Sequence, residues 1–214
     1  MLTVTKVSAR KSAYRLWLGS ALLALLPAGC ARFSAADPLL DKATAKLTIA
    51  EMGRMVAVVK TNYGKFVIEL HPEWAPLATR NFITLIRAGY YDGLSVCEIR
   101  PGVWIRGGEP KGDCLGGPGY LVPLERPSAP VVRGAVGLHH FDMRPKTGSS
   151  QIFIMLNDAP NMTGSYTIFG KVIEGMAAVD RIGKLSVTSR EGVPRPYMPL
   201  PSVVFEDMHL EVKR

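Results

Sequence analysis

The chain carries few of the side chains that nucleophilic, acid–base or metal chemistry uses. It has four histidines, and two of them, His139 and His140, are adjacent. Neighbours on a β-strand point to opposite faces, so this pair should not share a metal ion. Ser149 and Ser150 lack the second glycine of a nucleophile elbow. The glycines of residues 116–119 lack the spacing of a phosphate loop or dinucleotide fingerprint. We therefore expect no serine hydrolase, no metal site and no cofactor.

Rotation about an X-Pro amide is one reaction that needs none of these groups. The amide must cross a barrier of about 18–20 kcal/mol, and no bond to a nucleophile forms. An apolar pocket for the proline ring, a groove for the extended peptide and a hydrogen-bond donor at the twisted amide nitrogen are sufficient.

A series of motifs from residue 75 to residue 176 resembles the signature of bacterial cyclophilin-type prolyl isomerases. In chain order they are Ala75-Pro76 with Asn81-Phe82, Tyr91-Asp-Gly-Leu94, Ile99-Arg-Pro-Gly-Val-Trp-Ile-Arg-Gly-Gly-Glu109, Gly116-Gly-Pro-Gly-Tyr120, Ser149-Ser-Gln-Ile-Phe-Ile154, Asn157-Asp-Ala-Pro-Asn-Met-Thr-Gly-Ser-Tyr-Thr-Ile-Phe-Gly-Lys-Val172 and Glu174-Gly-Met176. The resemblance covers nearly all of residues 54–214, which we define as a cyclophilin-like domain. It implies a mostly β fold, a closed eight-stranded β-barrel capped by two α-helices.

The position of the family's catalytic arginine is occupied by a glutamate. In the family, a Phe-His-Arg triplet presents an arginine to the prolyl amide, and the aligned residues here are Val96, Cys97 and Glu98. The glutamine that lies beside that arginine aligns with Arg106. Either Arg106 extends into the vacated space as the donor, oriented by Glu98 through a bidentate pair, or the two form an ion pair that merely fills the groove.

The resemblance also assigns the residues that would bind substrate. Phe153 aligns with the aromatic residue of the proline pocket, Met162 with its aliphatic wall and Gln151 with the glutamine that contacts the peptide backbone. The remaining predicted substrate-binding residues are Val103, Trp104, His139 and Tyr166. His139 replaces a small residue of the family's groove and could narrow it.

Sequence patterns independently predict the elements that must position these residues. Residues 55–60 and 65–70 form a β-hairpin pattern around Gly64. A helix should begin near Pro76 and end at Gly89, with an apolar stripe facing the core. A second helix is expected over 176–182. Further short strands are expected at 95–99, 103–106, 135–138, 152–155, 166–173 and 203–212.

The first 29 residues have the layout of a secretory signal peptide. A basic segment precedes the apolar run Leu16–Pro27, which is shorter than the roughly 20 residues that span a bilayer. Residues 26–30 resemble a bacterial lipoprotein box, so we expect Cys30 to be lipidated and residues 30–53 to be a lipidated N-terminus and flexible spacer. The alternative is an ordinary cleaved signal with an incidental cysteine.

Export would place the protein in the cell envelope or periplasm, as a lipoprotein held at a membrane. An oxidising compartment permits Cys97 and Cys114 to pair, although each could instead be a small buried hydrophobic residue. The net charge of +8 falls once residues 1–29 are removed, because 22 basic residues then face 18 acidic ones. The basic residues are scattered, which argues against nucleic-acid binding.

Two functions remain open on the sequence alone. The first is a peptidyl-prolyl cis-trans isomerase, a folding catalyst acting on X-Pro bonds of exported proteins, with activity that the Glu98 exchange could weaken. The second is a non-catalytic cyclophilin-fold module that binds proline-containing segments in the cell envelope. A monomer is expected in either case.

Overall fold

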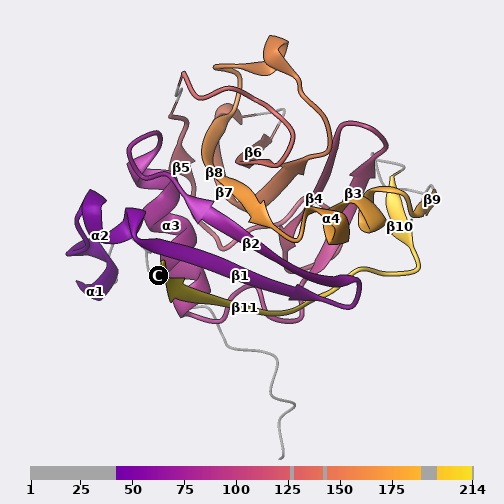
Figure 1. Ribbon diagram of the computed structural model, residues 1–214, viewed down its shortest axis with the longest axis horizontal. Coiled ribbons are helices and arrows are strands. Elements are labelled where there is room, and N and C mark those ends of the chain that lie inside the picture. The colour runs from indigo at the N-terminus through magenta and orange to yellow at the C-terminus, as the bar shows by residue number, and fades with distance from the viewer. Residues whose placement is uncertain (1–41, 126–127, 142–143, 189–196, 214) are drawn as a thin grey trace, which may run out of the picture. The chain divides into compact units, whose positions relative to one another are not determined.

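The computed structural model describes residues 42–125, 128–141, 144–188 and 197–213 (Figure 1). The strands are β1 (Met55–Thr61), β2 (Gly64–Leu70), β3 (Ser95–Arg100), β4 (Trp104–Glu109), β5 (Val122–Pro123), β6 (Ala135–Phe141), β7 (Arg144–Met155), β8 (Thr167–Glu174), β9 (Ser186–Thr188), β10 (Met198–Leu200) and β11 (Phe205–Val212). The helices are α1 (Lys42–Ala45), α2 (Ile49–Gly53), α3 (Pro76–Arg87) and α4 (Met176–Gly183), with a 3₁₀ turn η2 (Pro160–Met162).

One curled antiparallel sheet dominates these residues. Its main path runs β11-β1-β2-β8-β6-β7-β4-β3, and β5 pairs with β7 beside this path. The two ends of the path approach each other through a single bridge between Ser95 and Val204. Hydrogen bonds from Val96 N to Val203 O (2.9 Å) and from Phe205 N to Leu94 O (2.8 Å) extend the contact. The predicted mostly β barrel of eight strands is therefore confirmed, with partial closure.

The β1–β2 hairpin and the two longer helices lie where the sequence predicts them. Gly64 has φ +120°, which the turn between β1 and β2 requires and which other residues rarely adopt. Helix α3 starts at Pro76, and the chain turns at Gly89 with φ +64°. Helix α4 extends the predicted range by one residue, to Gly183.

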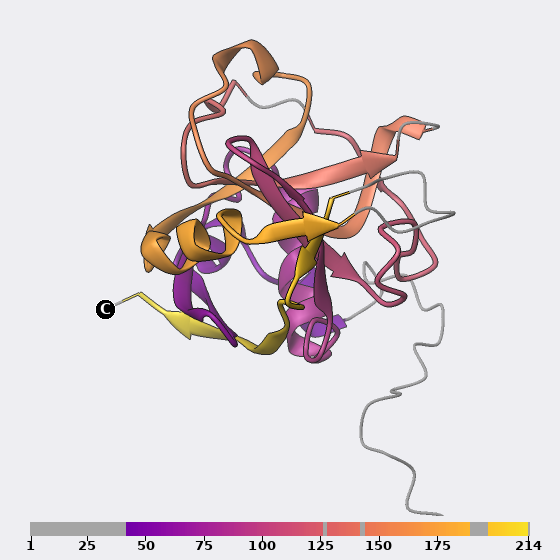
Figure 2. The ribbon, with the colours of Figure 1, turned by 90° about the vertical axis from the view of Figure 1, so that its right-hand side faces the viewer.

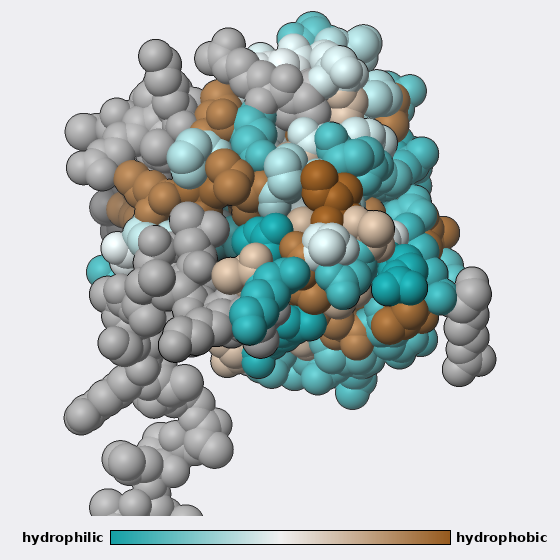
Figure 3. All heavy atoms as spheres, turned by 90° about the vertical axis from the view of Figure 1, so that its left-hand side faces the viewer, coloured by the Kyte–Doolittle hydropathy of each residue, from teal (hydrophilic) through white to brown (hydrophobic). Residues whose placement is uncertain are grey.

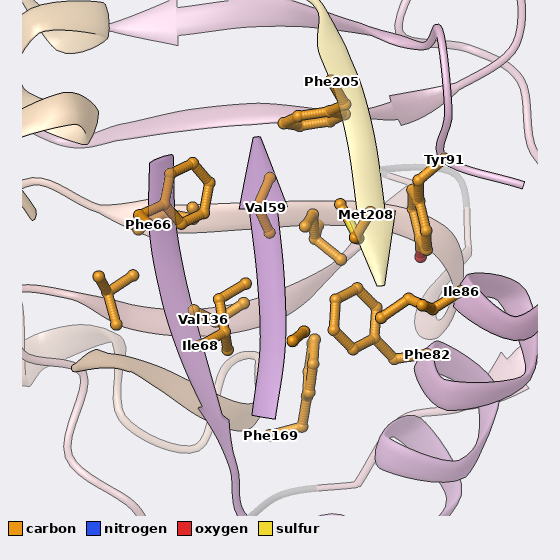
Figure 4. Close-up of a cluster of buried hydrophobic side chains, with 14 of the residues drawn as sticks. Val59, Phe66, Ile68, Phe82, Ile86, Tyr91, Val136, Phe169, Phe205 and Met208 are labelled. Atoms are coloured by element: carbon orange, nitrogen blue, oxygen red, sulfur yellow. The ribbon is translucent and has the colours of Figure 1, made fainter. Parts of the chain in front are cut away.

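The core lies between α3 and the inner face of the sheet. Figure 4 shows Phe82 and Ile86 projecting from α3 toward the strands. The Phe82 ring lies 5.0 Å from that of Phe169 on β8 and 5.4 Å from that of Tyr91. Burial of each such side chain stabilises the fold by about 1.5–3 kcal/mol. The predicted apolar stripe of α3 thus anchors the helix against the sheet.

Residues 42–53 differ from the flexible spacer that we expected there. They form α1 and α2, and α2 begins with a capping box in which Glu51 N donates to Thr48 Oγ1 (3.1 Å) and Thr48 N donates to Glu51 Oε2 (2.7 Å). The Met52 side chain is fully buried in the barrel core. Residues 42–53 therefore belong to the folded domain, which we expected to begin at residue 54.

Helix α3 fastens this N-terminal segment through arginine side chains. Arg80 donates to the backbone carbonyls of Thr44 and Leu47, and Arg87 donates to Thr44 Oγ1 at 3.1 Å. Figure 3 shows the face of the molecule that carries α1 and α2, where hydrophobic residues occur in small groups among hydrophilic ones. Among the described residues, no helix is long and apolar enough to cross a membrane.

The strands β9 and β10 form a small sheet that the sequence did not predict. They pair in antiparallel fashion, and Ile99 N of β3 donates to Tyr197 O at 2.7 Å just before β10. Figure 2 shows β10 in yellow beside β9 in orange, next to the β3–β4 hairpin. This small sheet flanks the hairpin that carries the Glu98 and Arg106 positions.

Candidate functional site

The predicted catalytic pair lies across the β3–β4 hairpin. Glu98 and Arg106 are directly opposed in the strand register, so their side chains share one face of the sheet. Arg106 Nε lies 2.9 Å from Glu98 Oε2, and both side chains are 0% exposed. A charged group buried to this extent needs a compensating partner, since an unpaired buried charge is strongly destabilising. Each residue of the pair is thus the partner that compensates the buried charge of the other.

Two further donors complete the surroundings of the Glu98 carboxylate. Trp104 Nε1 donates to Oε2 at 3.0 Å, and Arg100 Nε donates to Oε1 at 3.3 Å. The Arg100 guanidinium also lies 5.0 Å from the Trp104 ring centroid, in cation–π geometry. The carboxylate is therefore shared between two arginines, so Glu98 acts as an acceptor that orients its neighbours and not as a donor.

The far end of the Arg106 guanidinium meets a glutamine and a histidine. Nη1 lies 3.2 Å from Gln151 Oε1, and it lies 3.0 Å from His139 Nδ1. Nη1 also lies 3.2 Å from His139 Nε2, and which ring nitrogen accepts depends on the tautomer of the imidazole. The Gln151 amide nitrogen donates in turn to the backbone carbonyls of Cys114 (3.1 Å) and Gly116 (2.9 Å). A chain of polar contacts thus runs from the loop after β4 to the guanidinium.

An aromatic cluster lies beside this polar chain. The Phe153 ring lies 5.5 Å from Trp104 and 5.1 Å from Tyr166, and it is fully buried. Val103 and Met162 are partly buried against the same cluster. The structure thus brings together all of the predicted catalytic and substrate-binding residues. Their assigned roles stay predictions.

Our expectation that His139 and His140 point to opposite faces is wrong. Their ring centroids lie 5.9 Å apart, and the His140 ring stacks on Tyr166 at 4.6 Å. The pairing of β6 with β7 shifts register between Leu138 and His140 and again after His140, which interrupts the alternation of a regular strand. Among the described residues, no group of three or more His, Cys, Asp or Glu side chains could hold a metal ion.

Cys97 and Cys114 form a disulfide, which decides between the two alternatives left open by the sequence. Their Cα atoms are 5.6 Å apart, within the range that a disulfide spans. The bond joins β3, next to Glu98, to the loop whose carbonyls hold Gln151. The sequence analysis did not predict that the disulfide-bonded loop contacts Gln151. The only local signal for a link between the disulfide and the site was that Cys97 is adjacent to Glu98.

Cys30 and the predicted signal peptide lie outside the described residues.

The fold and this site define a recognisable class. The family model "Cyclophilin type peptidyl-prolyl cis-trans isomerase/CLD" matches residues 56–203. The chain belongs to this family.

Curated relatives and solved structures agree with this membership. The chain is 38% identical over 145 residues to a peptidyl-prolyl cis-trans isomerase of Schizosaccharomyces pombe, covering 66% of this chain and 92% of that protein. It is 37% identical over 130 residues to one from Helicobacter pylori, covering 59% and 78%. A crystal structure of a Cryptosporidium parvum cyclophilin-type isomerase, solved in the presence of the dipeptide Ala-Pro, matches with a TM-score of 0.65 at 28% identity, covering 73% and 98%.

Proposed function

We propose that this chain is a peptidyl-prolyl cis-trans isomerase acting on X-Pro bonds in segments of exported proteins. The observation that carries the proposal is that Arg106 on β4 and Phe153 on β7 are direct cross-strand partners. Cross-strand partners project from the same face of a sheet. A proline ring seated against Phe153 would therefore bring its amide nitrogen close to the Arg106 guanidinium.

Arg106 would supply the hydrogen bond that the twisted amide needs. Rotation breaks amide resonance and leaves a lone pair on the nitrogen, which an N–H donor stabilises only as the transition state forms. Arginine stays protonated under all ordinary conditions, so it remains a donor. Glu98 and Gln151 would act as positioning residues, because each contacts the guanidinium from a different side.

The His139 ring must move before this donor can reach a substrate. Arg106 is 1% exposed and His139 is 4% exposed, and the two side chains are in contact. A peptide entering the groove would displace the imidazole and take its place at Nη1. We therefore assign His139 the role of a cover over the donor.

The burial of Arg106 also favours a second candidate function. If the Glu98–Arg106 pair and its His139 cover stay closed, the aromatic cluster could still hold proline-containing segments without accelerating their isomerisation. The protein would then be a binding module of the cell envelope.

An isomerisation assay on the purified full chain separates the two functions. A tetrapeptide with a central X-Pro bond should interconvert faster than in buffer alone, and Phe153→Leu should remove most of the acceleration. Phe169→Leu, an equally buried phenylalanine in the barrel core, is the matched control for general destabilisation. An uncatalysed rate, together with peptide-induced chemical-shift changes at Trp104, would establish the binding module instead.

The proposed cell-envelope location rests on the N-terminal sequence and gains support from the disulfide. Disulfides persist in oxidising compartments and are rare in the cytosol. Expression of the full chain in bacteria with a radiolabelled fatty acid should label the parent and not Cys30→Ser. An unlabelled parent would remove the lipid anchor from the proposal.

We also propose that the protein is a monomer. Light scattering should give the mass of one chain, and a mass of two chains would contradict this proposal.

A further inference from the structure

The loop between β4 and β5 reaches the candidate site through its backbone. Gln151 donates both amide hydrogens to this loop, to the carbonyls of Cys114 and Gly116, and its Oε1 accepts from Arg106. An amide group that is hydrogen-bonded at both its nitrogen and its oxygen has one orientation. A flipped amide would place its N–H donors against the Arg106 donor and its oxygen against the two carbonyl oxygens. The position of the loop therefore decides which way Gln151 presents its oxygen to Arg106.

Two kinds of interaction hold this loop in place at Cys114. One is the disulfide to Cys97. The other is the buried Glu109 carboxylate, which accepts from the backbone N–H of Cys114 (3.2 Å) and of Lys111 (2.8 Å). Cys114 has φ +62°, a conformation that a non-glycine residue keeps only when its surroundings enforce it. Of these interactions, the disulfide links the loop directly to β3, beside Glu98.

We propose that the Cys97–Cys114 disulfide is a positioning element of the isomerase site and that its reduction lowers activity. The bond holds the Cys114 carbonyl in place, this carbonyl orients Gln151, and Gln151 orients Arg106. Reduction by a dithiol transfers two electrons and two protons to the disulfide. The S–S bond breaks, Cys97 and Cys114 become thiols, and the reductant leaves as a cyclic disulfide. The inference rests on the proposed function in taking Arg106 as the donor.

The kinetic test compares full-chain variants in a thermodynamic cycle. Removal of the disulfide by Cys97→Ala with Cys114→Ala should lower kcat/KM about 10-fold, since a displacement of 1 Å at a reacting group can cost on the order of 100-fold. Gln151→Ala should lower it by a similar factor. In the triple variant, loss of the disulfide should have no further effect, because its action passes through Gln151.

A general loss of stability should not reproduce these changes in kcat/KM. Val59→Ala creates a cavity on β1, which pairs with β2 and β11 and with neither β3 nor β4, and it should lower the melting temperature without changing kcat/KM. Multiplicative effects of the disulfide and Gln151 substitutions would overturn the inference. So would a disulfide-free variant with the kcat/KM of the parent.

A spectroscopic readout keeps the test valid even if the parent shows no isomerase activity. The two Nε2 protons of Gln151, assigned by their absence in Gln151→Met, should be well separated in the nitrogen–proton spectrum of the oxidised protein. They should move toward free-amide positions in the disulfide-free variant. An inactive parent with this shift would contradict the proposed function and leave the positioning role standing. Unchanged Gln151 resonances would overturn the positioning role itself.

Discussion

Glu98 and Arg106 are direct cross-strand partners, and they form an ion pair in which neither side chain is exposed to solvent. In this pair the acceptor is on β3 and the cation is on β4, the strand that pairs with β7 and places Arg106 opposite Phe153. Removing one member of a buried ion pair strongly destabilises the folded state, because the remaining charge is left buried without a partner. The stability of the site and the chemistry that we propose for it therefore depend on the same two residues.

Neutralising one member of this pair should destabilise the protein more than neutralising both. Glu98→Gln leaves the Arg106 charge buried without its anion, and we expect a loss of about 3–5 kcal/mol in the free energy of unfolding by urea. Adding Arg106→Gln should recover most of the loss. Additive losses in the two single variants and the double variant would contradict the pairing.

Removing the His139 cover should make the guanidinium easier to reach. If about one molecule in ten is uncovered in the parent, His139→Ala should lower the apparent KM for a tetrapeptide about 10-fold. His139→Gln retains bulk and an acceptor for Nη1, so its KM should stay nearer to that of the parent. Equal KM values for parent and His139→Ala would exclude a covering role.

Much of this site could be predicted from the sequence because the family resemblance assigns it residue by residue. The resemblance places Arg106 beside Glu98, and it specifies Gln151 and Phe153, which lie on β7, the strand that pairs with β4. The contact of His139 with Arg106 could not be predicted, since it depends on register shifts that arise only when β6 pairs with β7.

The N-terminal boundary was a different kind of error. Thr48 and Glu51 have the spacing of a capping box, so a local signal for α2 was present in the sequence. We assigned residues 42–53 to a spacer because the family resemblance begins later. The burial of Met52 and the hydrogen bonds of Arg80 depend on tertiary structure, so no local sequence pattern predicts them.

The space beside Phe153 should be intolerant of even one methyl group. A Cβ at Gly137 would lie 2.5 Å from Phe153 Cζ and 2.9 Å from Ile168 Cδ1. Gly137→Ala should therefore displace the Phe153 ring, lower the free energy of unfolding by about 1–3 kcal/mol and weaken peptide binding. Gly53→Ala, where the nearest atom would be at 3.6 Å, is the control and should change neither quantity appreciably. A Gly137→Ala protein as stable as the parent would show that the ring has room to relax.

One pH effect on stability is expected far from the site, at His209 on β11. The hydrogen bond to Asp207 raises the pKa of His209, and the contact with Glu211 adds to this effect. A raised pKa in the folded state stabilises the protein fully below the unfolded value of about 6.5, and the contribution is lost as pH rises through the folded pKa. Because the ring is half exposed, the contribution should be below about 1 kcal/mol.

Urea unfolding of the parent and His209→Gln between about pH 5 and pH 9 measures this contribution. The difference in unfolding free energy should be largest at the acid end and shrink toward the alkaline end. A constant difference across the range would contradict the raised pKa.

The most direct test of the account is the kcat/KM of the variant that carries both Glu98→Gln and Arg106→Gln. This variant removes the proposed donor without leaving an unpaired buried charge, so it can remain folded. We expect a fall of at least about 100-fold, the usual effect of removing one donor to a transition state. A folded double variant with the kcat/KM of the parent would show that Arg106 is not the donor.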